Sequence, residues 1–180
     1  MNPKKIVIAG GPGTGKTTII NELKNRDFIC YDEISRQITL QARAEGIEQM
    51  FLTEPLLFSQ KLLDGRINQF KEATNESESV VFLDRGIPDV LAYMDFIGDT
   101  YPKHFVDACE KHIYDYIFVL APWQEIFTSD NERYENFEEA IKIHDHLIDT
   151  YKRFSYKLID VPFGNVESRA NFILESLNLE

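Results

Sequence analysis

Short runs of mostly apolar residues alternate along the chain with longer stretches of helical period. An apolar run of four or five residues between polar segments is typical of a strand that is buried on both faces. Strands of this kind belong to parallel sheets, because the helices that connect them cover both faces. The predicted strands are 5–9, 28–31, 80–83, 116–120 and 156–160.

The intervening stretches repeat apolar side chains every three or four residues, which is the spacing of one helix face. Pro55 suits the first position of such a helix, since it has no backbone N–H to lose there. The same spacing places Leu56 and Leu63 on one face of that helix. The predicted helices span 17–24, 33–44, 55–70, 88–96 and 102–111. A long amphipathic helix follows the polar stretch 122–136 and carries apolar residues from Ile141 to Phe154, and a last helix spans 166–177.

Strands and helices alternate over the whole length, and no internal repeat, low-complexity segment or linker interrupts them. This order predicts an α/β fold in which a doubly wound, parallel five-stranded sheet carries helices on both faces. We therefore expect a single domain over residues 1–180. Active groups gather at the carboxyl ends of the strands in such sheets, so the residues after each run are the first candidates for chemistry.

The balance of charge narrows the choice of partners. The chain has 30 acidic and 19 basic side chains among 180 residues, a net charge of −11, and 43% of its residues are hydrophobic. A field of this sign repels nucleic acid, and no run of Lys or Arg offsets it, so DNA and RNA are not expected as partners. A phosphate-bearing ligand would be held by a few local cations, which directs attention to individual arginines.

We expect a cytoplasmic protein that is not bound to a membrane. Glycine breaks the apolar run near the N-terminus too early for a signal peptide, and no segment approaches the length of a membrane span. Cys30 and Cys109 stand alone in the sequence, which is typical of buried thiols in a reducing compartment.

Residues 10–17 match the phosphate-binding loop motif G-x-x-x-x-G-K-[ST] at every fixed position, between a predicted strand and a predicted helix. Glycines let the backbone curl until its N–H groups face a polyphosphate, and the helix adds the positive end of its dipole. Lys16 would meet the β- and γ-phosphates as a catalytic cation, and the Thr17 hydroxyl would ligate Mg²⁺. The sequence thus predicts binding of ATP and Mg²⁺, with the nucleotide held by Gly11, Gly13, Thr14, Gly15, Lys16, Thr17 and Thr18.

The loop alone does not separate kinases, GTPases and motor ATPases, but three absences from the sequence help. No N-K-x-D element is present to read guanine, which disfavours a Ras-like GTPase, although the sequence leaves ATP and GTP open. Asp84 is followed by Arg85, where many P-loop hydrolases have the Glu that activates water. The chain after the core is too short for the helical lid domain of an AAA+ machine.

The chain as a whole resembles the P-loop nucleoside and nucleotide kinases. The resemblance is carried by the phosphate loop, Tyr31-Asp32-Glu33, Asp84-Arg85-Gly86 and the Arg-containing segment 130–134. It is closer still to a less characterised, AAA-labelled family of P-loop ATPase/kinase-like proteins related to the nicotinamide riboside kinase domain of the bacterial NAD regulator. That likeness is carried by YDEISRQI, FLDRGIPD and NERYENFEEAIKIHDHLIDTYKRFSYKLIDVP. It implies the three-layer P-loop NTPase fold.

The resemblance also implies roles for four residues at strand ends. Asp84 takes the Walker B position and holds Mg²⁺ directly or through water. Arg85 and Arg36 point into the acceptor pocket, and Glu33 accepts the proton of the acceptor hydroxyl. Three of them have a structural alternative: Asp84 as a helix cap, Glu33 as a carboxylate favoured by the helix dipole, and Arg36 as a solvated or ion-paired residue.

Two further positions follow from the same resemblance. Arg133 belongs to a small lid-like segment, about 122–136, that closes on the transferred phosphate as a catalytic arginine. A salt-bridge network with its acidic neighbours is the alternative, and the segment holds one arginine where kinase lids usually bring two or more. Pro162 and Phe163 fall where related kinases hold adenine.

These features together predict a P-loop kinase that transfers the γ-phosphoryl group of Mg·ATP to a small acceptor: a nucleoside, a nucleotide or a related metabolite. The alternative is an ATPase or regulatory ATP- or GTP-binding protein without such an acceptor. A third possibility is a GTP-using protein with a lipid partner, which the net negative charge of the chain disfavours.

A deep pocket between Glu33 and Arg85 would favour the enzyme, and a filled pocket would favour the regulatory protein. The sequence leaves monomer and homodimer open.

Overall fold

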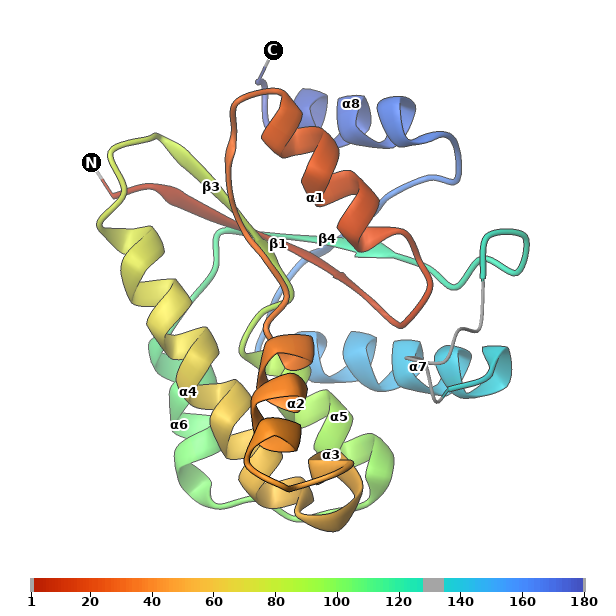
Figure 1. The fold of residues 1–180 in the computed structure, drawn as a ribbon. Helices are drawn as coiled ribbons and strands as arrows, with labels where there is room; N and C mark the ends of the chain where they lie inside the picture. Colours follow the sequence, from red (N-terminus) through yellow and green to blue (C-terminus); the bar gives the residue numbers. More distant parts are fainter. Residues whose placement is uncertain (1, 128–134, 180) are drawn as a thin grey trace.

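The structure, a computed structural model, describes residues 2–127 and 135–179. A parallel sheet in the order β2-β3-β1-β4-β5 forms the middle layer (Figure 1). Its strands are β1 (Lys4–Gly10), β2 (Ile29–Tyr31), β3 (Val80–Asp84), β4 (Tyr116–Leu120) and β5 (Leu158–Asp160).

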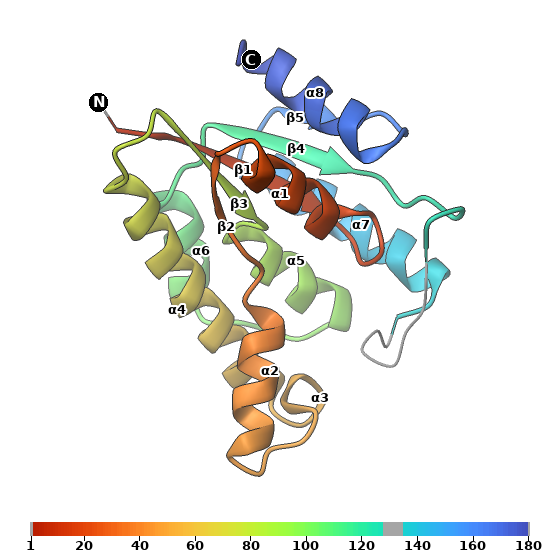
Figure 2. The same cartoon turned by 45° about the horizontal axis from the view of Figure 1, so that its top comes forward.

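Helices cover both faces of this sheet, as Figure 2 shows from a second direction. One face carries α1 (Lys16–Asn25) and α8 (Val166–Ser176). The other carries α4 (Pro55–Thr74), α5 (Pro88–Ile97), α6 (Lys103–Lys111) and α7 (Phe137–Arg153), while α2 (Ser35–Ala44) and α3 (Met50–Thr53) pack against α4. Of the helices in the described part of the chain, none is both long and apolar enough to cross a membrane.

The central strand shows why both faces need cover. Ile6 and Ile8 of β1 pack toward α1 and α8, whereas Val7 and Ala9 belong to the core on the opposite face, and all four are buried. Side chains alternate in this way because successive Cβ atoms of a strand point to opposite faces. An apolar run without polar alternation is therefore the signature of this middle layer, and the doubly wound parallel sheet predicted from it is confirmed.

The helices agree with the sequence pattern less closely than the strands do. The short helix α3 was not expected, and Leu56 of α4 is 43% exposed, so its predicted place on the buried face is wrong. The buried stripe of α4 includes Phe58, Leu62 and Leu63, so the predicted place of Leu63 is confirmed. Helix α7 begins at Phe137 because the Asn136 side chain accepts a hydrogen bond from the backbone N–H of Glu139, in a reciprocal capping box.

The topology brings three predicted site segments to one edge of the sheet. Strand β1 lies between β3 and β4, and its register pairs Ile8 with Asp84, so the loop after β1 begins beside the end of β3. Strand β2 is the next neighbour of β3, with Tyr31 opposite Leu83. The phosphate loop, residues 32–33 and residues 84–86 are thus adjacent because of strand order alone.

Candidate functional site

The phosphate loop has the backbone shape that its glycines permit. Gly13 and Gly15 have φ values of 71° and 92°, in the left-handed region where a side chain would be strained. Gly15 is also the N-cap of α1, and no described side chain caps the first turn of that helix. The N–H groups at the start of α1 are therefore left for another acceptor, which is the arrangement that binds phosphate at helix N-termini.

The Lys16 side chain lies within the loop that precedes it. It is 7% exposed, and its Nζ donates to the Gly11 carbonyl at 2.7 Å and to Thr14 Oγ1 at 3.4 Å. Burial, with help from the nearby Arg85, lowers the pKa of the Lys16 ammonium to about 7. An anion beside the loop would favour the charged form, so this cation is placed to gain from a phosphate ligand.

Asp84 offers a carboxylate oxygen with no hydrogen-bond partner. The residue is 5% exposed, and its buried Oδ1 has no partner among the described residues. Burial raises the pKa of Asp84, while Lys16 and Arg85 oppose that shift. Asp84 and Thr17 line one cavity, and a hard cation such as Mg²⁺ is bound by one or two carboxylate or hydroxyl oxygens together with substrate phosphates. The donor set therefore fits Mg²⁺ with a nucleotide.

The turn after β3 is held from several sides. Arg85 has a φ of 73°, and its backbone N–H donates to the Ile8 carbonyl at 3.0 Å. The Gly86 N–H donates to Asp89 Oδ2 at 2.9 Å, and the Gly86 carbonyl accepts from Arg66 at 3.0 Å. These bonds keep a non-glycine residue in the left-handed region, where it would otherwise be strained.

Glu33 is held by hydrogen bonds on both oxygens. Oε1 accepts from the backbone N–H groups of Ile34 and Ser35 at 3.0 Å and from Arg66 at 3.1 Å, and Oε2 accepts from the Ser35 hydroxyl. Burial raises the pKa of this carboxyl, but Arg85, Arg66 and Ser35 together outweigh burial and bring it down to about 2. In this arrangement Glu33 is an anchored anion at the start of α2.

A cavity of about 500 Å³ joins these parts. Its volume lies in the range of pockets that bury small organic ligands. Glu33, Asp84, Arg85 and Arg36 share it with the phosphate loop, so the structure brings these predicted residues together. The loop and strand-end wall consists of residues 12–18, Asp32, Glu33, Asp84 and Arg85, and the helical wall includes Arg36, Arg43, Phe51, Phe58, Leu62, Arg66, Val90, Tyr93 and Ile143.

The residues predicted to hold adenine lie on the other side of the loop. Phe163 is 54% exposed and stacks on Trp123, with ring centroids 4.7 Å apart. The residues that follow it, Gly164 and Asn165, line a second cavity. Neither Pro162 nor Phe163 lines that cavity. Arg133 lies outside the described residues, so its catalytic role stays a prediction.

Two arginines that the sequence did not single out are buried near the loop. Arg66 is 4% exposed and contacts both Glu33 and Gly86, and Arg169 is 3% exposed and donates to the Thr14 carbonyl at 3.0 Å. Each has a signal in the helix pattern, since Arg66 follows Phe58 and Leu62 at spacings of four and Arg169 precedes Ile173 by four. A cation on an apolar stripe is a sign of a buried polar contact.

The family model described as AAA domain matches residues 5–169, nearly the whole chain. No curated protein matches the chain.

Solved structures support the fold. NadR in complex with NR gives a TM-score of 0.77 at 19% identity over 99% of this chain, which spans 52% of that protein. A deoxyadenosine kinase from M. mycoides with dCMP and dCDP bound gives 0.71 at 17% identity, covering 97% of this chain and 98% of that one. A thymidylate kinase from Candida albicans gives 0.66 at 17% identity, covering 98% and 92%. The likeness to P-loop nucleoside and nucleotide kinases is thereby confirmed for the fold.

Gly86→Ala should destabilise the turn that carries Asp84 and Arg85. The added Cβ would lie 2.8 Å from the Tyr151 hydroxyl and 3.1 Å from a ring carbon of Tyr114, and overpacking of this kind costs about 1–3 kcal/mol. Chemical denaturation measures the loss. Because the Tyr151 hydroxyl is the nearest atom, Tyr151→Phe should cost less in the Gly86→Ala background than alone. Equal stability of wild type and Gly86→Ala would mean that the turn is not tightly held.

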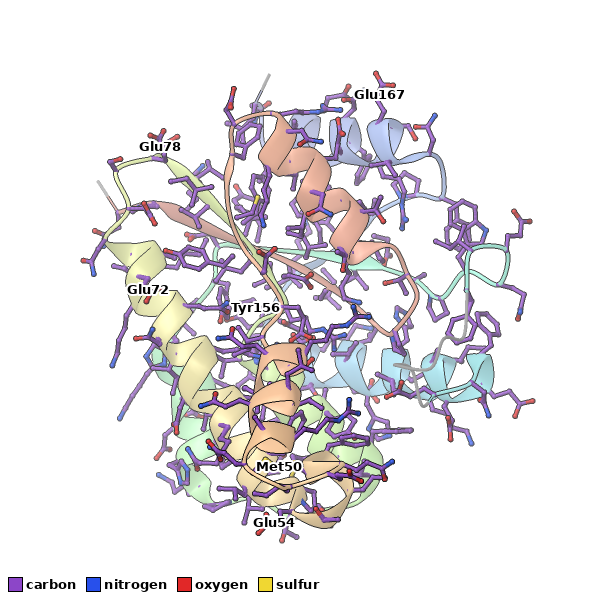
Figure 3. All side chains as sticks on the ribbon, in the orientation of Figure 1. Met50, Glu54, Glu72, Glu78, Tyr156 and Glu167 are labelled. Carbon is purple, nitrogen blue, oxygen red and sulfur yellow. The ribbon has the colours of Figure 1, made fainter. Side chains whose placement is uncertain are left out.

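Glu33→Gln should lower the free energy of unfolding by about 3 kcal/mol at pH 7, given a pKa lowered from 4.5 to about 2. A carboxyl group whose pKa is lower in the folded protein than in the unfolded chain stabilises the fold at pH values above its unfolded pKa. The difference between wild type and variant should thus be constant above pH 4.5 and shrink as pH falls from 4.5 toward 2. Denaturant titrations at several pH values measure it. Glu78→Gln, on the exposed turn before β3 (Figure 3), is the control and should change stability little. A difference independent of pH would contradict the anchored-anion description.

Proposed function

The chain belongs to the family described as AAA domain, and we propose that it is a P-loop phosphotransferase that moves the γ-phosphoryl group of Mg·ATP to a small acceptor. The observation that carries this proposal is the cavity of about 500 Å³ that Glu33 and Arg85 line together with the phosphate loop. The cavity extends beyond the phosphate loop to a helical wall that includes Arg36, Phe51 and Phe58, which offers surface for a second substrate beside the nucleotide phosphates. The nucleoside and nucleotide kinases among the similar structures support the same reaction class.

The donor side of the reaction rests on the loop. Its backbone N–H groups and Lys16 would hold the β- and γ-phosphates, with Gly11, Gly13, Thr14, Gly15 and Thr18 shaping the cradle. Thr17 and Asp84 would hold Mg²⁺, which, when bound, neutralises charge on the phosphate oxygens. Lys16 and Arg85 add positive charge at the place where negative charge is transferred. Catalysis of this kind is mainly positioning and electrostatic stabilisation.

The acceptor side combines apolar and cationic surfaces. Phe51, Phe58 and Leu62 give the cavity an apolar wall that suits a nucleobase or another flat ring. Arg36 and Arg43, seven residues apart on α2, line the same cavity. Among the described residues, five cationic and five carboxylate side chains line the cavity, and Arg36 and Arg43 are the cations on α2, where a ligand with negative charge can contact them.

The bonding of Glu33 bears on the kind of acceptor. A hydroxyl acceptor loses a proton on transfer and gains from a general base with a pKa near the working pH. Glu33, with both oxygens bonded and a pKa of about 2, is a weak base in this arrangement. A phosphate acceptor is already ionised and needs no base. A phosphate-bearing acceptor, such as a nucleoside monophosphate, therefore fits the cavity better than a nucleoside does.

Lys16→Ala should remove most of the affinity for Mg·ATP while leaving the fold intact. The lost contact is a charged one to phosphate, so titration calorimetry should show a loss of roughly tenfold or more. Asp84→Asn should raise the Mg²⁺ concentration needed for half-maximal binding. Circular dichroism is the control for folding. Wild-type affinity in a folded Lys16→Ala variant would contradict nucleotide binding at this loop.

Matched pairs of acceptors test the reaction and its substrate class together. Nucleosides and their 5′-monophosphates are offered with Mg·ATP, and with Mg·GTP in parallel, while ADP or GDP release and the phosphorylated product are measured. We expect turnover with at least one monophosphate and not with its nucleoside. Turnover with nucleosides alone, lowered roughly 10²–10⁴-fold by Glu33→Gln, would restore Glu33 as the general base.

Charge variants of the cavity sharpen this experiment. Arg36→Gln and Arg43→Gln should each raise the KM for the monophosphate with little effect on the KM for ATP. Lys103→Gln removes the same charge from the exposed end of α6 and should leave both KM values unchanged. If neither acceptor class is phosphorylated but ATP changes the conformation, the regulatory alternative replaces the kinase.

A further inference from the structure

A second cavity, of about 630 Å³, lies against the same phosphate loop. Gly13, Gly15 and Thr18 line both cavities, so the loop forms a shared wall. The two cavities lead in opposite directions. The first cavity reaches Phe51, which follows Met50 in the chain, and the second reaches Val166, which precedes Glu167. Figure 3 shows Met50 and Glu167 at opposite ends of the molecule.

Arg169, in the first turns of α8, lines the second cavity and is bound to the loop. One terminal nitrogen, NH1, donates to the Thr14 carbonyl at 3.0 Å, and a Cβ on Gly15 would meet the same nitrogen at 3.1 Å. The guanidinium carbon lies 5.7 Å from the centre of the Trp123 ring. With 3% exposure, Arg169 is one of the most buried charged residues among those described.

The remaining nitrogens of this guanidinium lack partners. Nε and NH2 are buried without a hydrogen-bond partner among the described residues, and no described carboxylate forms an ion pair with Arg169. Burial lowers the pKa of Arg169, yet an arginine stays charged at neutral pH. A buried charge with unsatisfied donors destabilises the folded chain, so a purely structural arginine would be expected to have an acidic partner.

Arg26, whose side chain is 27% exposed, is an arginine with such partners. It lies at the end of α1 and links that helix to α8, as Arg169 links α8 to the loop. Its Nε donates to Glu22 at 2.9 Å and its NH1 donates to Asn171 at 2.6 Å. Arg26 is thus compensated within the protein, whereas Arg169 is left with donors beside a cavity that borders an anion-binding loop.

We infer that Arg169 is a nucleotide-binding residue, which holds the loop through Thr14 and donates its free N–H groups to the part of the donor nucleotide that occupies the second cavity. The inference rests on the proposed function for its ligand, Mg·ATP. A guanidinium has donors only, so it contacts acceptor atoms of the nucleoside part of the nucleotide, such as ring nitrogens or ribose oxygens. The Trp123 ring beneath it supplies a cation–π contact that keeps the guanidinium in place.

Arg169→Met tests this inference through two ligands that share the phosphates and differ in the nucleoside. Titration calorimetry measures the affinity of wild type and variant for Mg·ATP and for Mg·tripolyphosphate. The variant should lose roughly 10- to 100-fold in affinity for Mg·ATP, the size of lost charged hydrogen bonds, and clearly less for tripolyphosphate. The deciding quantity is the ratio of the affinity for Mg·ATP to the affinity for Mg·tripolyphosphate, which we call the preference for ATP. A general loosening of the fold would weaken both affinities and leave this ratio unchanged.

Stability supplies a second readout. Because Arg169 is charged, buried and incompletely bonded, Arg169→Met should unfold at the same temperature as wild type or higher when no nucleotide is present. Arg26→Met is the matched control and should unfold at a lower temperature with an unchanged preference for ATP.

An unchanged preference in Arg169→Met would overturn the inference, whatever the stability. Its failure can be told from failure of the proposed function. The latter appears in the wild type as ATP binding without acceptor phosphorylation, and it leaves the binding comparison intact. A wild type that does not bind ATP would overturn both.

Discussion

A buried guanidinium from α4 joins the ends of two strands, and the candidate site depends on that junction. Arg66 donates to Glu33 after β2 at 3.1 Å and to the Gly86 carbonyl after β3 at 3.0 Å. One planar group thereby fixes the distance between the start of α2 and the turn that carries Asp84 and Arg85. Breaking such a bond would leave buried partners unsatisfied, which costs more than the bond itself contributes. The first cavity keeps its shape because both strand ends are tied to the same helix.

Burial of charge links the stability of this fold to its chemistry. Lys16 and Asp84 both titrate away from their ordinary pKa values, and burial is the first cause in each case. Without a ligand, the buried charges of Lys16 and Asp84 destabilise the folded protein. A phosphate would stabilise the charge of Lys16, and a cation would stabilise that of Asp84. Arg169 extends this pattern to the far side of the loop. The net charge of −11 contrasts with the cations Lys16, Arg85 and Arg169, which lie at or beside the loop.

The sequence predicted what depends on local pattern and missed what depends on tertiary contact. The strands and the phosphate loop are continuous motifs, and strand order alone brought Asp84 beside the loop. Arg66 and Arg169 became visible as site residues only once the helices were packed, although each lies on an apolar stripe. The position of Glu33 was anticipated, but its partners come in part from Arg66, 33 residues away. On α4 the predicted face is buried at Leu63 but exposed at Leu56, in the first turn, where only packing decides.

The central claim is that the phosphate loop and the first cavity form one site in which two substrates meet. Ligands that join adenosine to a second nucleoside through a chain of phosphates occupy both halves at once. The second nucleoside is varied in a series of such ligands, and the affinity of each ligand is compared with that of Mg·ATP. A gain in affinity shows that the phosphate loop and the first cavity are connected. The account predicts that at least one such ligand binds roughly 10²-fold or more tightly than Mg·ATP, with the gain reduced by Arg36→Gln and Arg43→Gln. Affinities no better than that of Mg·ATP throughout the series would contradict it.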